Sequence, residues 1–280
     1  MVLLLGESGV GKTSLIHAGL IPEVTRKGWR VVYSRPLGLP STDITRQLLA
    51  TIFEGRPFYK GPLIPLIGEI SGAIQGQYLL LIVDQFEDIL LSRSDGEVDD
   101  LVSDLRTFKN VKPPSVSILL SYRSDLEGRL GQYWQHISGS ALGLPRYYLK
   151  GVALDPAWES LERIAHSLKI DLDLKMEEKE RIKKDLLFAS NALGFTEVYP
   201  PYIQMTADHF WASSIGSKYH FKFYQEAGAM NGIIAGYLGR QLKYAQDTQG
   251  KMRAVLVSLV RSYGIKAQKE IKEIVAEAFF

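Results

Sequence analysis

Short apolar runs alternate with amphipathic segments along the first 150 residues of the chain. Five runs have the length and composition of β-strands: Val2–Leu5, Arg30–Ser34, Tyr78–Val83, Ser115–Ser121 and Tyr147–Lys150. The third run contains five consecutive apolar residues, as expected of a strand that is buried on both faces of a sheet. Helical spacing predicts helices at 14–20, 41–53, 62–72 and 95–108. The alternation predicts an α/β fold in which a parallel sheet is flanked by helices.

The pattern changes after about residue 152, where strand-like runs give way to helical spacing. Asp155-Pro156 has the form of a helix N-cap followed by proline in the first turn. Further helices are predicted at 175–191, 201–211, 231–246, 251–262 and 267–280. We therefore expect an all-helical part to follow the sheet.

The nine residues after the first strand contain the spacing of a phosphate-binding loop. They read Gly6-Glu7-Ser8-Gly9-Val10-Gly11-Lys12-Thr13-Ser14. Glycines let the backbone turn sharply, and successive N–H groups can then form a nest for phosphate oxygens at a helix N-terminus. In such a loop Lys12 reaches the terminal phosphates and the Thr13 hydroxyl holds Mg²⁺. A glycine-rich turn that binds nothing is the alternative.

A second motif follows the third predicted strand. The strand ends in Asp84, and at the carboxyl edge of a parallel sheet this carboxylate would lie beside the phosphate loop and hold Mg²⁺. Glu87 is the candidate to orient or deprotonate an attacking water. An acidic residue in the first turn of a helix also stabilises the helix dipole, and this alternative for Glu87 stays open.

A third motif is carried by the fourth predicted strand, which delivers Arg123 to the same edge. Its guanidinium could contact the γ-phosphate or pair with Glu87. It could instead form an ordinary ion pair with Asp125.

Composition narrows the function further. Lys and Arg number 33 against 31 Asp and Glu, so no basic excess indicates nucleic acid as a partner. The chain has no cysteine, which fits a reducing cytosol. The longest apolar run, Tyr78–Val83, is too short to span a membrane. Guanine-binding proteins carry an Asn-Lys-x-Asp motif, which this sequence lacks; we therefore expect ATP rather than GTP.

These motifs together resemble those of the STAND NTPases, most closely the novel STAND type of prokaryotic signalling and antiphage proteins. The resemblance rests on Gly6–Leu20, Val83–Glu87 and Tyr122–Asp125, and it continues in Tyr199–Met205 and Tyr224–Gly232. One departure is a Gly-Gly pair of the family, which is Gly228-Ala229 here. A second departure concerns the segment that packs over the adenine in the family. It normally precedes the first strand and is missing from this sequence. A phosphate-loop strand seldom opens a natural chain, and we expect a longer protein.

The resemblance implies a P-loop NTPase core at 1–152, a helical lid at 153–248 and the beginning of a winged-helix region at 249–280. It also implies that Pro201 of the lid touches a nucleotide held between core and lid. Such proteins are cytoplasmic switches that bind ATP or ADP and hydrolyse ATP slowly. Their copies assemble on activation, and sensor and effector domains lie in the same full-length chain.

Two other functions compete with the switch. One is an AAA+-like ATPase that acts continuously on nucleic acid or protein. The other is a small-molecule phosphotransferase, which would need a second substrate pocket that the sequence does not identify.

Overall fold

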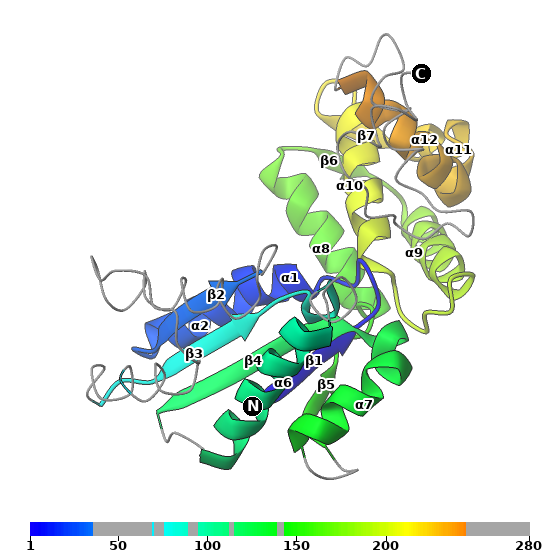
Figure 1. Cartoon of the computed structure of the whole chain (residues 1–280). Coiled ribbons are helices and arrows are strands. Elements are labelled where there is room, and N and C mark those ends of the chain that lie inside the picture. The colour runs from blue at the N-terminus through cyan, green and yellow to red at the C-terminus, as the bar shows by residue number, and fades with distance from the viewer. Residues whose placement is uncertain (36–68, 70–75, 89–94, 112–114, 139–142, 245–280) are drawn as a thin grey trace. The chain divides into compact units, whose positions relative to one another are not determined.

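The computed structural model describes residues 1–35, 69, 76–88, 95–111, 115–138 and 143–244 (Figure 1). The chain divides into two compact units, Met1–Lys150 and Gly151–Phe280. The predicted helices at 41–53, 251–262 and 267–280, nearly all of the helix at 62–72, and the predicted region 249–280 lie outside the described residues. Within the described ranges, no helix has the length and apolar character needed to cross a bilayer.

The first unit is built on a parallel sheet of five strands. In spatial order they are β2 (Arg30–Ser34), β3 (Leu79–Val83), β4 (Val116–Arg123), β1 (Val2–Gly6) and β5 (Arg146–Tyr148). Every neighbouring pair is parallel. All five residues of β3 are buried. The predicted α/β fold with a parallel sheet is confirmed, and each strand starts and ends within two residues of its prediction.

The strand order sets the geometry at the carboxyl edge of the sheet. β4 lies between β1 and β3, so the strand before the phosphate loop and the strand before Asp84 are not neighbours. In the β1–β4 register Gly6 pairs with Arg123. The first residue of the loop is therefore directly opposite the arginine.

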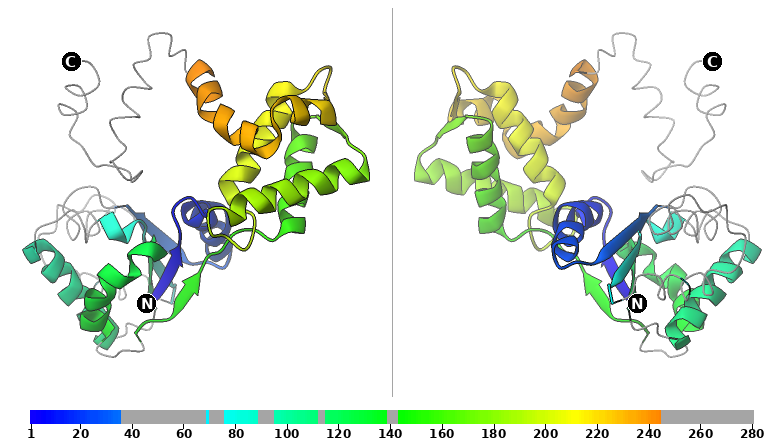
Figure 2. Two further views of the ribbon diagram at one scale, coloured as in Figure 1. Left: turned by 90° about the vertical axis from the view of Figure 1, so that its right-hand side faces the viewer. Right: turned by 90° about the vertical axis from the view of Figure 1, so that its left-hand side faces the viewer.

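Helices cover both faces of this sheet. On one face α6 (Asp95–Val111) and α7 (Glu127–Ser138) pack against β-strand side chains such as Leu5, Leu81 and Leu120. The other face carries Leu4, Leu80 and Leu119 and packs against the helix that follows the phosphate loop. Figure 2 shows α6 and α7 on one side of the sheet and α2 on the other.

The helix after the loop is continuous from Lys12 to Arg26 but changes its winding. Residues Lys12–Ser14 (α1) and Ile21–Arg26 (α2) are α-helical, whereas Leu15–Leu20 form a π-helix in which the Ile21 N–H donates to the Ile16 carbonyl. Pro22 cannot donate a backbone hydrogen bond and its ring clashes with the carbonyl four residues earlier in an α-helix. The wider turn before Pro22 accommodates this ring without ending the helix.

The sequence prediction missed α7. This helix contains Gly128 and Gly131, which lower helix propensity. Its apolar positions Leu130, Trp134 and Ile137 nevertheless recur at helical spacing and are all buried. Tertiary packing of this apolar face therefore outweighs the weak local preference.

The second unit is mainly helical. Its helices are α8 (Leu154–Ser167), α9 (Met176–Asn191), α10 (Pro200–Ser213), α11 (Phe221–Glu226) and α12 (Ala229–Tyr244). It is not all-helical as predicted, because Asp171–Asp173 (β6) pairs in parallel with Lys218–His220 (β7). Three-residue strands are too short for alternation to reveal them in the sequence. The pairing depends on bringing together two segments that lie 47 positions apart in the chain, since Asp171 pairs with Lys218.

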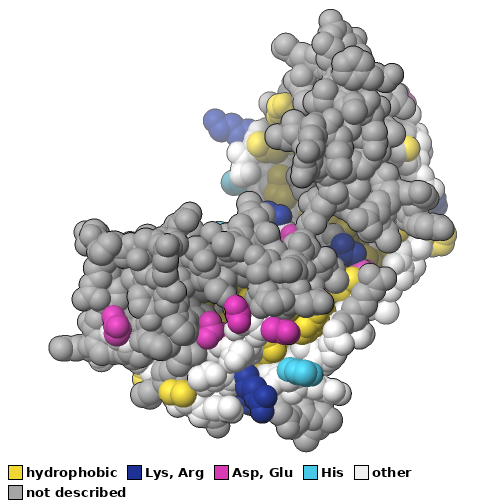
Figure 3. All heavy atoms as spheres, in the orientation of Figure 1, with side chains coloured by type: hydrophobic (Ala, Val, Ile, Leu, Met, Phe, Trp, Pro, Cys, Tyr) yellow, Lys and Arg dark blue, Asp and Glu magenta, His cyan; other side chains and the backbone are white. Residues whose placement is uncertain are grey.

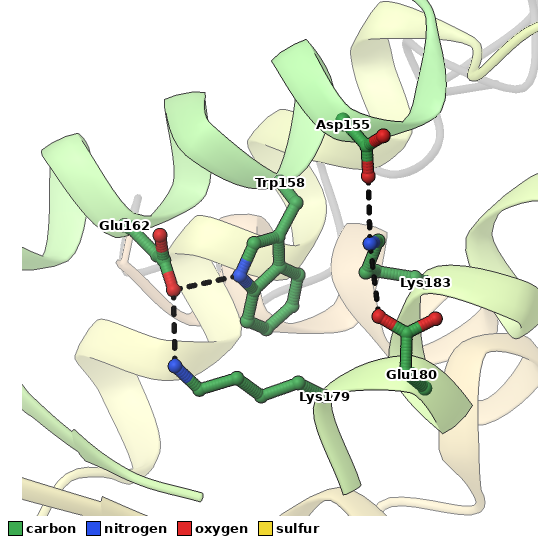
Figure 4. A network of polar contacts seen from close by, with 6 residues as sticks. All are labelled: Asp155, Trp158, Glu162, Lys179, Glu180 and Lys183. Carbon is green, nitrogen blue, oxygen red and sulfur yellow. Dashed lines mark hydrogen bonds and ion pairs between the residues drawn. The ribbon is translucent and has the colours of Figure 1, made fainter. Parts of the chain in front are cut away.

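Polar side chains join α8 to α9 at their shared surface (Figure 4). The Trp158 indole N–H donates to Glu162 over 2.7 Å, and Lys179 donates to the same carboxylate over 3.1 Å. Lys183 donates to Asp155 over 2.7 Å and to Glu180 over 2.9 Å. These groups satisfy a mostly buried indole N–H and fix the pairing of the two helices, although the partly exposed ion pairs add little stability each.

Candidate nucleotide site

The phosphate loop connects β1 to the first helix. Gly9 and Gly11 have φ angles of 78° and 98°, in the left-handed region that favours glycine. Gly6 is constrained by space, because an added Cβ would lie 2.7 Å from Val10 Cγ1 and 2.8 Å from the Leu149 carbonyl oxygen. Val10 is buried, whereas Ser8 and Gly9 are exposed. One side of the loop therefore packs against the protein, and the other side faces solvent.

Lys12 lies within this loop rather than in solvent. Its ammonium donates to the carbonyl oxygens of Gly6 over 2.7 Å and Glu7 over 3.0 Å. Burial lowers the pKa of Lys12, and the nearby charges of Glu87 and Asp84 oppose that shift. The ammonium is thus held at the loop, where it can exchange backbone carbonyls for phosphate oxygens.

Asp84 is almost completely buried at the end of β3 and accepts hydrogen bonds from three groups. Thr13 Oγ1 donates to Oδ2 over 2.6 Å and Tyr33 donates to the same oxygen over 3.0 Å. The Gln85 N–H donates to Oδ1 over 3.0 Å, with Gln85 itself in a left-handed conformation of φ 53°. Thr13 follows β1 and Asp84 follows β3, and β4 lies between these two strands in the sheet. Their hydrogen bond brings together the two residues predicted to hold Mg²⁺.

Glu87 lies in a helical turn just beyond Asp84 and is 5% exposed. Burial raises the pKa of its carboxyl group to about 7, and a hydrogen bond from its own backbone N–H, followed by the positive charges of Lys12 and Arg123, limits the rise. Its Oε2 has no hydrogen-bond partner. A buried carboxylate with an open acceptor can take a proton from a water molecule.

Arg123 is at the end of β4, between the loop and the acidic segment. It forms a bidentate ion pair with Asp125, with Nε to Oδ1 at 3.0 Å and Nη2 to Oδ2 at 2.6 Å. This hydrogen bonding raises the pKa of Arg123 and lowers that of Asp125. The structure thus contains the Arg123–Asp125 pair, the second of the two arrangements that the sequence left open.

The donor set at Thr13 and Asp84 fits a magnesium ion. A hydroxyl and a carboxylate oxygen are the hard oxygen ligands that Mg²⁺ prefers, and a phosphate group would complete its coordination. Among the described residues, no cluster of three or more His, Asp and Glu side chains offers another metal site. The carboxylate and the loop therefore suit a metal that arrives with a nucleotide.

Sequence reasoning missed Tyr33, the fourth residue of β2. Its hydroxyl reaches Asp84 because β2 neighbours β3 in the sheet, and Ser34 is paired with Val83. The only signal in the sequence was its position near the carboxyl end of a strand. Pro201, the predicted nucleotide contact of the second unit, lies in the first turn of α10.

The sequence model of one family, described as Novel STAND NTPase 1, matches residues 1–278. The chain belongs to this family. It is therefore a P-loop nucleoside triphosphatase, and the resemblance found in its motifs is confirmed. No curated protein matches the sequence significantly.

Solved structures with a similar fold include P-loop ATPases. The Walker-type ATPase PABY2304 of Pyrococcus abyssi has a TM-score of 0.57 and 14% identity, over 99% of this chain and 83% of that chain. The Aeropyrum pernix ORC1 protein, solved in complex with DNA, has a TM-score of 0.51 and 14% identity, over 92% of this chain and 65% of that chain. At such identities the likeness concerns the fold alone.

Proposed function

We propose that this STAND NTPase chain is an ATP-binding, slowly hydrolysing switch of a signal-transduction or defence protein. The observation that supports it most directly is the 2.6 Å hydrogen bond between Thr13 and Asp84, beside a glycine loop with Lys12 at its centre. In the proposed role, the nucleotide state controls self-assembly and activation of an effector.

The residues have distinct tasks in this proposal. Backbone N–H groups of Gly6–Ser14 bind the phosphates and Lys12 neutralises their charge. Thr13 and Asp84 hold Mg²⁺, which when bound offsets the charge that develops on the phosphate oxygens. Glu87 orients and deprotonates the attacking water.

Arg123 supplies a reason for regulated turnover. Its guanidinium is paired with Asp125, and the pair must loosen or rotate before the guanidinium can contact a γ-phosphate. In this proposal the Asp125 carboxylate and the γ-phosphate compete for Arg123, so the position of the guanidinium depends on which nucleotide is bound. Such a dependence favours a nucleotide-controlled switch over a continuously cycling enzyme.

The remaining parts of the proposal rest on the family resemblance. We propose that Pro201 contacts the nucleotide, that other copies of the chain are the partners on activation, and that sensor and effector domains belong to the full-length protein. A cytoplasmic location agrees with the absence of cysteine. On the face in Figure 3, the Lys and Arg side chains of the described residues lie apart from one another.

Nucleotide binding tests the first part of the proposal. Fluorescent ADP, ATP and GTP analogues are titrated against the parent chain and the Lys12→Ala variant, with Lys27→Ala as the control. Lys27 is an exposed lysine at the end of the same helix, paired with Glu23. We expect ATP to bind more tightly than GTP, and Lys12→Ala to lose at least about a hundredfold in affinity. Unchanged affinity in Lys12→Ala would remove the loop from the site.

Turnover and mass measurements test the switch itself. Hydrolysis should be slow with or without DNA, and light scattering should show a higher mass with a non-hydrolysable ATP analogue than with ADP. Rapid hydrolysis stimulated by DNA or RNA would overturn the switch and favour an AAA+-like ATPase that acts continuously on nucleic acid.

A further inference from the structure

Tyr33 links the second strand to the carboxylate at the end of β3. Its hydroxyl donates to Asp84 Oδ2 over 3.0 Å, and Thr13 donates to the same oxygen over 2.6 Å. The Gln85 N–H takes one position on Oδ1. A carboxylate offers about four acceptor positions. Three are used by these donors, so one position on Oδ1 is left for a ligand.

The Tyr33 side chain is itself held in place. Its ring lies 4.3 Å from the His17 ring, centroid to centroid, with the planes tilted by 55°. It also packs against the apolar cluster on the face that carries Leu4 and Leu80. A tyrosine hydroxyl carries its proton at neutral pH, so it can act as the donor to Asp84.

We propose that Tyr33 is a positioning residue for magnesium: its hydroxyl fixes the Asp84 carboxylate so that the remaining acceptor faces the metal or its bound water. This inference rests on the proposed function, because it requires a Mg²⁺-nucleotide at the loop. Without the hydroxyl, Oδ2 would be held by Thr13 alone and Oδ1 by the Gln85 N–H, so the carboxylate would be freer to turn about its Cβ–Cγ bond. Groups that orient a metal ligand commonly change metal affinity by about 10- to 100-fold.

The decisive variant is Tyr33→Phe, which removes the hydroxyl but keeps the ring against His17. Binding of fluorescent ADP to the full chain is measured first in EDTA and then over a Mg²⁺ titration. We expect the affinity in EDTA to match the parent, while the Mg²⁺ concentration for half-maximal tightening rises on the order of tenfold. Tyr148→Phe is the control: Tyr148 lies in β5 of the same sheet, and its hydroxyl donates to the carboxylate of Glu127 in α7, away from the loop.

Each outcome separates the inference from the proposed function. If the parent chain does not bind ADP, the proposed function fails. If the parent binds ADP with a Mg²⁺ dependence that Tyr33→Phe leaves unchanged, the role of Tyr33 is overturned while the nucleotide site stands. Weaker binding of Tyr33→Phe in EDTA would also overturn it, because Tyr33 would then act on the loop or nucleotide rather than on the metal.

A second variant keeps the test informative if Tyr33→Phe lowers the yield of folded protein. His17→Ala leaves the hydroxyl in place but removes the ring that supports it. Its Mg²⁺ midpoint should move in the same direction by roughly threefold, a smaller effect than loss of the donor itself. An unchanged midpoint in His17→Ala would contradict the proposed support of Tyr33.

Discussion

Replacing Glu87 by glutamine removes a buried ionisable group while keeping its shape. The side chain is 5% exposed, and its Oε2 has no hydrogen-bond partner. Burial raises the pKa of the carboxyl group from 4.5 to about 7. The amide cannot ionise, so the variant isolates the contribution of this charge.

The pKa of Glu87 fixes both the sign and the size of the stability effect. Because the folded state binds the proton more tightly than the unfolded state, Glu87 contributes stability that is complete below about pH 4.5 and is lost as the pH rises through about 7. At about 1.4 kcal/mol per pH unit, the loss is about 3 kcal/mol. Glu87→Gln should therefore lack this loss and be more stable than the parent at pH 8.

Hydrogen exchange is the suitable assay, because the chain has two units and need not unfold in one step. Protection of β3 and β4 peptides is compared at pH 5 and pH 8, after correction for intrinsic exchange rates. Glu23→Gln is the control, since Glu23 is a partly exposed carboxylate paired with Arg26. Parallel pH profiles for the parent and Glu87→Gln would refute the reasoning, because they would mean that solvent reaches the carboxyl group.

The same variant tests the catalytic role. Only ionised Glu87 can accept a proton, so kcat/KM for ATP should rise with pH up to about 7 in the parent. Glu87→Gln should bind nucleotide normally but hydrolyse it roughly 10²- to 10⁴-fold more slowly. Hydrolysis at the parent rate would return Glu87 to the role of a helix N-terminal carboxylate.

Three further predictions follow from single residues. Ala229→Gly should stabilise the second unit by about 0.5–1 kcal/mol in thermal unfolding, because Ala229 has a left-handed φ of 57°. The control is Ala227→Gly, which should destabilise the unit because Ala227 has a right-handed conformation. A lower melting temperature for Ala229→Gly would contradict the prediction. Gly6→Ala should weaken ADP binding at least about tenfold and lower stability by about 1–3 kcal/mol, since its Cβ would clash with Val10 and Leu149; Gly128→Ala, which meets nothing within 4 Å, is the control. Asp125→Asn should release Arg123 and raise the ratio of ATP to ADP affinity roughly threefold to tenfold, and an unchanged ratio in calorimetric titrations would show that the ion pair does not compete with phosphate.

The five strands were predictable because each has a recognisable pattern of apolar residues in its own segment of the sequence. Leu79–Val83 is uniformly apolar since both of its faces are buried, and this needs no knowledge of the rest of the fold. The helix α7 and the β6–β7 pair have weaker local sequence patterns. Gly128 and Gly131 mask the helical preference of α7, and three-residue strands are stabilised only by their partner.

The sequence by itself determined the chemistry available at the loop. The glycines permit left-handed turns, and Lys12, Thr13 and Asp84 supply an ammonium, a hydroxyl and a carboxylate, because backbone freedom and functional groups are properties of single residues. Tertiary structure alone decided how these groups meet. The order of strands places Arg123 opposite Gly6 and brings the Tyr33 hydroxyl to Asp84, and burial sets the pKa of Glu87. Distances and desolvation arise from segments far apart in the chain, and no local pattern records them.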